Sequence, residues 1–100
     1  MDRITDILIR FAKSRIRSLE AIKKCCQGHY DAAKRIERVA EYFSSKPSAV
    51  QIGCIRQIEG ELKLLLPSET SRFKNLRIQI LSLIDQCHQY YESMEKSPTT

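Results

Sequence analysis

Hydrophobic residues recur at steps of three and four through most of this chain, which is the period of one face of an α-helix. The last third of the sequence carries such a stripe in Phe73, Leu76, Ile80, Leu83, Cys87, Tyr90 and Met94. The same spacing joins Leu19, Ile22, Cys26, His29, Ala33, Ile36, Ala40 and Phe43, and then Ile55, Ile58, Leu62 and Leu65. Strand-like alternation and Asn-Gly or Asp-Gly hairpin turns are absent from the sequence. We therefore predict an all-α protein.

The N-terminal half is predicted to begin a helix near Asp2 or Thr5. Its apolar stripe slips between Phe11 and Leu19, which indicates either curvature or a change of packing partner along the helix. Gly28 is suited to end a helix, so we predict a break or sharp kink near Gly28. Because the stripe continues past this point without a change of phase, one continuous helix to Phe43 is the alternative.

Two prolines mark the remaining boundaries. A loop is predicted at residues 44–48, and Pro47 suits the first turn of a third helix that ends near Leu66, before Pro67. The last helix is expected to start at Ser68 or Ser71 and to run to about Glu95. The short loops predict a small antiparallel bundle of three to four helices, with one domain at residues 1–96 and a disordered polar tail at 97–100.

The net charge of +5 lies entirely in the first half of the chain. Residues 1–46 hold eleven of the seventeen Lys and Arg residues and six of the twelve Asp and Glu residues, and the remainder of the chain is balanced. On a helix, Arg10, Lys13, Arg17 and Lys24 would share one face. The basic face that we predict for an acidic partner or for phosphates consists of Arg10, Lys13, Arg15, Arg17, Lys23 and Lys24.

This basic face has three interpretations: a solvated surface, a site for an acidic protein, and a site for nucleic acid or anionic lipid. The sequence shows no recognition helix with a cluster of Asn, Gln and Arg opposite an apolar face. Aromatic residues also do not alternate with the basic ones, as stacking on single strands would require. Among the possible partners we therefore prefer an acidic protein and keep non-specific nucleic-acid binding as the alternative, while the solvated surface stays open.

Candidate chemistry is sparse. Cys26 and His29 could share a zinc ion with Cys87, but no Cys-x-x-Cys pair supports such a site, and we expect these residues to fill the core. No catalytic triad, glycine-rich phosphate loop or paired-carboxylate site is present in the sequence. The prediction is a protein with no metal, no cofactor and no enzymatic activity.

The cysteines and the hydropathy bear on location. The longest apolar run, residues 64–66, is far shorter than the roughly 20 residues of a membrane span. Charged residues interrupt the N-terminus, so we predict no signal peptide. The four cysteines are then expected to be reduced in the cytoplasm and to pack as small hydrophobic residues.

The third helix carries a second regular face. Val50, Gly53, Gln57, Gly60 and Leu64 follow steps of three and four on the side away from Ile55, Ile58 and Leu62. Glycine inside a helix costs about 0.5–1 kcal/mol relative to alanine, so two glycines on one face call for a reason. They indicate either a crowded crossing within the bundle or a face that docks a partner helix or a second copy. We thus predict a non-enzymatic interaction module: a small adaptor, chaperone or assembly subunit.

Overall fold

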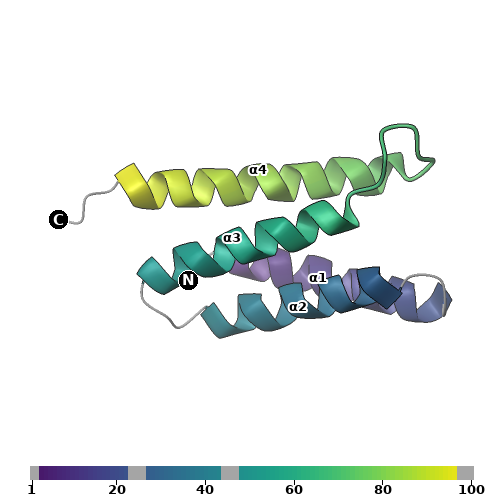
Figure 1. The fold of residues 1–100 in the computed structure, drawn as a ribbon, viewed down its shortest axis with the longest axis horizontal. Coiled ribbons are helices and arrows are strands. Elements are labelled where there is room, and N and C mark those ends of the chain that lie inside the picture. The colour runs from purple at the N-terminus through teal and green to yellow at the C-terminus, as the bar shows by residue number, and fades with distance from the viewer. Residues whose placement is uncertain (1–2, 23–26, 44–47, 97–100) are drawn as a thin grey trace.

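The computed structural model describes residues 3–22, 27–43 and 48–96. These residues form four helices: α1 (Arg3–Ile22), α2 (Gln27–Phe43), α3 (Ser48–Leu65) and α4 (Lys74–Lys96). Successive helices run in opposite directions and lie side by side, with α3 between α2 and α4 in the view of Figure 1. The prediction of a small antiparallel all-α bundle is confirmed, at the upper end of the predicted number of helices.

The predicted break near Gly28 is confirmed, but Gly28 does not end a helix. Because α1 ends at Ile22 and α2 begins at Gln27, the alternative of one continuous helix is wrong. The interruption precedes Gly28, which is the second residue of α2 and not a C-terminal cap. Within α2, the Asp31 carboxylate accepts a hydrogen bond from the Gln27 side chain at 2.9 Å. Residues 23–26, between the two helices, lie outside the described part.

The last helix starts later than predicted, at Lys74 instead of Ser68 or Ser71. The serines belong to a turn: the Ser71 amide donates to the Ser68 carbonyl at 3.0 Å. The Phe73 amide then donates to the Ser71 hydroxyl at 3.0 Å, so this hydroxyl is used before α4 begins. Phe73 consequently precedes α4 and is 54% exposed, although its spacing placed it on the core stripe. The predicted loop around Pro47 and the polar tail at 97–100 lie outside the described residues.

The core follows the predicted stripes in most places. All four helices contribute to the main cluster, whose fully buried large side chains are Leu8, Ile36, Phe43, Ile55, Ile58, Leu62, Leu65, Ile80 and Cys87. A separate cluster joins the second half of α1 to α2 through Ile16, Leu19 and Ala33. The slip in the stripe of α1 thus falls where the helix passes from the main cluster to the separate cluster with α2. His29 is exposed at the start of α2, so its predicted core position is wrong.

The helices are not packed equally tightly around the bundle. Contacts are extensive between α1 and α2, between α2 and α3, and between α3 and α4. Helices α1 and α4 also meet, but only sparsely. The bundle therefore has one open seam, between its first and last helices.

Candidate functional site

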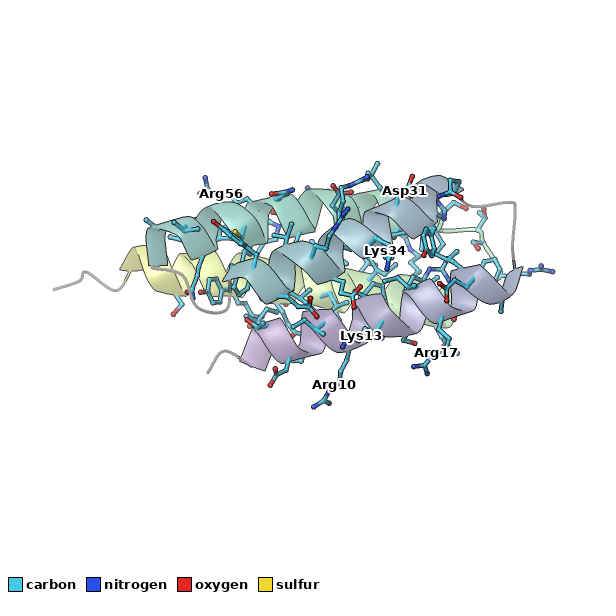
Figure 2. The ribbon with its side chains drawn as sticks, turned by 90° about the horizontal axis from the view of Figure 1, so that it is seen from below. Arg10, Lys13, Arg17, Asp31, Lys34 and Arg56 are labelled. Carbon is cyan, nitrogen blue, oxygen red and sulfur yellow. The ribbon has the colours of Figure 1, made fainter. Side chains whose placement is uncertain are left out.

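The outward face of α1 carries three exposed basic side chains, those of Arg10, Lys13 and Arg17. They lie on this face because Leu8, Ala12 and Leu19 are buried on the opposite side of the same helix. Figure 2 shows Arg10 and Arg17 projecting away from the bundle on the same side of α1. Within the described ranges, no carboxylate lies within ion-pair distance of the three side chains. From here on, the name basic face refers only to these three side chains. They form a concentrated positive charge that the fold itself does not neutralise.

The structure brings together only part of the predicted basic set. Arg15 is half-buried and lies toward the bundle, so it does not belong to the outward face. Lys23 and Lys24 lie outside the described residues. Asp6 is exposed one turn before Arg10, and Glu20 follows Arg17, where its carboxylate accepts a hydrogen bond from Tyr30 at 3.3 Å. The basic face is therefore bounded by one acidic residue at each end of its stretch of α1.

Basic residues of α2 do not extend this face uniformly. Arg35 makes a two-pronged contact with Glu61 of α3, with nitrogen–oxygen distances of 2.8 and 2.9 Å. This hydrogen bonding raises the pKa of the Arg35 guanidinium. Lys34 is half-buried, with its ammonium 5.9 Å from the centre of the Tyr30 ring. Arg35 thus differs from the three residues of the basic face, because a carboxylate of a neighbouring helix neutralises its charge.

A shallow groove lies beside the basic face, at the open seam between α1 and α4. Its volume is about 340 Å³, and it is lined by Ile7, Arg10, Phe11, Ser14 and Gln79. The α1 side of the groove is mixed: Ile7 and Phe11 are apolar, although Phe11 is only 5% exposed, whereas Arg10 and Ser14 are polar. Arg10 belongs to both the groove and the basic face. Apolar surface and unneutralised positive charge are thus adjacent.

The second predicted face, on α3, is exposed. Val50 is 40% exposed and Leu64 is 60% exposed, and Gly53, Gln57 and Gly60 between them are also exposed. A Cβ atom placed on either glycine would meet nothing within 4 Å. The crowded internal crossing that could have explained these glycines is therefore wrong. The α3 face presents a strip of accessible backbone between two apolar side chains.

Sequence reasoning missed a polar cluster between α3 and α4. The side chain of Glu59 is only 10% exposed, yet it accepts a hydrogen bond from the Tyr91 hydroxyl at 2.5 Å. Its other oxygen lies 2.5 Å from His88 Nε2 and 3.4 Å from Lys63 Nζ. The guanidinium of Arg56 lies 5.2 Å from the centre of the Tyr91 ring. The available signal was weak: Glu59 follows Ile58 and lies four residues after Ile55, at the edge of the buried stripe.

The electrostatics of the cluster favour an ionised Glu59. Burial acts to raise the pKa of this carboxyl, but hydrogen bonds from Tyr91 and His88 and the charges of His88 and Lys63 outweigh burial, leaving the pKa below its ordinary value of 4.5. The hydrogen bond to Glu59, with a smaller contribution from burial, raises the pKa of Tyr91 to about 12. The cluster is thus a charged clasp between two helices. Burial also raises the pKa of Cys87 to about 12. Because both groups stay protonated near neutral pH, neither Tyr91 nor Cys87 is suited to nucleophilic chemistry there.

The zinc alternative receives no geometric support. Cys26 lies outside the described residues, and His29 is exposed on α2, away from the buried stripe to which Cys87 belongs. Among the residues with defined positions, no three His, Cys, Asp or Glu side chains are grouped to hold a metal ion.

None of the helices in the described part of the chain has the length and apolar character of a membrane span. Comparisons of the chain with protein-family models, curated proteins and solved structures find no match.

Proposed function

We propose that this chain is a non-enzymatic protein-interaction module that binds an acidic partner protein through the basic face of α1. The observation that carries the proposal is the exposure of Arg10, Lys13 and Arg17 together, without a carboxylate partner in the described ranges. Three like charges on one face raise the free energy of the isolated domain through mutual repulsion. An acidic surface that covers them removes this repulsion and is steered toward them over about a Debye length.

The competing function is non-specific binding of nucleic acid through the same side chains. Phosphate contacts would release counterions, so the affinity would fall steeply and linearly on a logarithmic salt scale. Three contacts predict a slope near −3 on duplex DNA, since each neutralised phosphate contributes about −0.9. We therefore titrate the full chain with duplex DNA and with single-stranded RNA at about 50 and 200 mM salt. Absence of binding at the lower concentration removes this alternative.

The decisive experiment is affinity capture from the native source with two matched variants. Arg10→Glu/Arg17→Glu reverses charges on the basic face, whereas Arg38→Glu/Lys74→Glu reverses two exposed cations on α2 and α4. Both variants change the net charge by the same amount. The first is expected to weaken binding of the captured acidic protein by at least about tenfold, and the second by less than about threefold. Equal effects, or none, contradict the proposal.

A second contact, between copies of this chain, is proposed through the α3 face. Its support is the exposed strip from Val50 to Leu64, where Gly53 and Gly60 would let another helix backbone approach closely.

We further propose that the protein works in the reducing cytoplasm. Cys54 and Cys87 are buried as free thiols, and burial raises the pKa of both, Cys87 to about 12. Such thiols resist oxidation and disulfide exchange.

A further inference from the structure

We infer that the groove between α1 and α4 docks one amphipathic helix of the partner protein, with acidic residues along one edge of its apolar stripe. This inference rests on the proposed function, since it names the part of an acidic partner that the basic face holds. It adds an apolar docking site, and therefore a shape requirement, to a contact that charge alone would leave unspecific.

One row of α1 side chains, two apolar and one polar, lines the groove. Ile7, Phe11 and Ser14 follow one another at steps of four and three on α1, so the row extends along about 10 Å of the helix axis. Docked amphipathic helices present their anchors with the same i, i+4, i+7 spacing. An extended strand would present alternate residues and would not match this row.

The open seam leaves this groove uncovered by the rest of the bundle. A four-helix bundle normally closes by packing its first helix against its last, but α1 and α4 meet only sparsely here. Ile7 consequently remains half-buried, and Gln79 of α4 is exposed on the other side of the groove. At about 340 Å³ the groove is at the lower end of the size range of small-molecule pockets, which favours a few inserted side chains over a large ligand.

The charge around the groove favours an acidic occupant. Arg10 lines the groove itself, and Lys13 and Arg17 continue along the same helix on its outward side. Because Gln79 is neutral, the α4 residue that lines the groove does not cancel this charge. A helix with Leu anchors in the groove and Glu residues on the edge facing α1 would satisfy both surfaces together. A basic helix would bring like charges against Arg10.

The test uses the full chain labelled with ¹⁵N and a synthetic helical peptide of about 16 residues, with Leu at i, i+4, i+7 and i+11 and Glu beside the Leu stripe. A scrambled peptide of the same composition keeps the charge but lacks the stripe. We expect the peptide to bind more tightly than the scrambled version and to shift the amide signals of Ile7, Arg10, Phe11, Ser14 and Gln79.

A matched pair of variants separates the groove from the charge. Gln79→Trp fills the groove, whereas Gln89→Trp places the same side chain on another exposed site of α4, about 15 Å along the helix. Gln79→Trp should weaken peptide binding by about tenfold and leave the affinity for polyglutamate unchanged, while Gln89→Trp changes neither. Circular dichroism confirms that both variants fold.

The outcomes are distinguishable. If Gln79→Trp binds the peptide normally while Arg10→Glu does not, the groove inference is wrong and the proposed function stands. If neither peptide nor polyglutamate binds at about 50 mM salt, both fail. Tighter binding of duplex DNA or of phosphatidylserine vesicles than of the peptide overturns the inference in favour of a nucleic acid or a membrane surface.

Discussion

Removing the Tyr91 hydroxyl tests whether the clasp around Glu59 holds α4 onto α3. Tyr91→Phe keeps the ring, its packing and its contact with Arg56, and deletes only the donor that lies 2.5 Å from the Glu59 carboxylate. Glu59→Gln makes the complementary change: it keeps the shape and one acceptor oxygen but removes the charge. Both substitutions alter the Tyr91–Glu59 hydrogen bond, and Glu59→Gln also removes the charge that faces His88 and Lys63.

The expected magnitude follows from the environment of the pair. A hydrogen bond to a charged group contributes about 1.5–3 kcal/mol to stability. Tyr91 is only half-buried, so we take the lower part of this range and expect Tyr91→Phe to cost about 1.5–2 kcal/mol. Glu59→Gln should cost at least about 1–2 kcal/mol, since a neutral hydrogen bond replaces a charge-assisted one and the ion pairs with His88 and Lys63 are lost. The double variant should show a coupling of about 1 kcal/mol.

Urea denaturation followed by circular dichroism at 222 nm measures these differences. With a slope of about 2 kcal/mol/M for a domain of this size, Tyr91→Phe should lower the midpoint by about 1 M. Tyr30→Phe is the matched control, because the Tyr30 hydroxyl donates to the exposed Glu20 at the longer distance of 3.3 Å. The control should change the free energy of unfolding by less than about 0.5 kcal/mol.

The pH dependence gives a second check on the same pair. The pKa of Glu59 is lowered in the folded state, so the charged carboxylate contributes its full stability above 4.5 and loses it as the pH falls through the folded pKa. The difference between the wild-type protein and Glu59→Gln should shrink below that pH. The reasoning is refuted if Tyr91→Phe costs no more than Tyr30→Phe, or if the two substitutions at the clasp are simply additive.

Three further predictions concern other parts of the bundle. In the folded protein the pKa values of Tyr91 and Cys87 are both raised to about 12, from ordinary values of 10.0 and 9.0. Each group therefore contributes its full stability below its ordinary pKa and loses about 1.4 kcal/mol per pH unit toward pH 12, which alkaline denaturation measures. Gly53→Ala and Gly60→Ala should each raise the free energy of unfolding by about 0.5–1 kcal/mol, since a Cβ meets nothing within 4 Å; thermal melts that show destabilisation contradict this. Gly53→Leu/Gly60→Leu should leave the fold intact and abolish self-association in sedimentation, and a double variant that still associates excludes the α3 face.

Helical periodicity predicted the fold because each core residue of this bundle repeats on one face of its own helix. Ile36, Ile58, Leu62 and Ile80 are fully buried, as their spacing required. Periodicity failed where a helix begins. Phe73 lies in register with α4, but its amide is hydrogen-bonded to Ser71 in the preceding turn, and α4 begins only at the next residue. It also failed at His29, since a stripe can continue into a first turn that has no neighbour to cover it.

The surfaces were partly predictable for the same reason. Arg10, Lys13 and Arg17 share a face by spacing alone, and their exposure follows from the buried stripe opposite. Arg15 is different, because its position near the edge of that stripe turns it toward the bundle. The groove and the Glu59 clasp could not be predicted. Both depend on which residues of α4 lie beside α1 and α3, and helix spacing carries no information about that register.

The sparse contact between α1 and α4 has a consequence for how the chain folds. The remaining helix contacts join elements that are neighbours in the sequence, so the native structure needs few closures of long loops. Chains with such local topology fold in microseconds to milliseconds. Stability should also be uneven along the chain, with α1 and α4 opening before the inner pair α2 and α3, and amide hydrogens of the terminal helices exchanging first. The same seam thus makes the two ends of the chain the elements most able to separate while the inner pair persists.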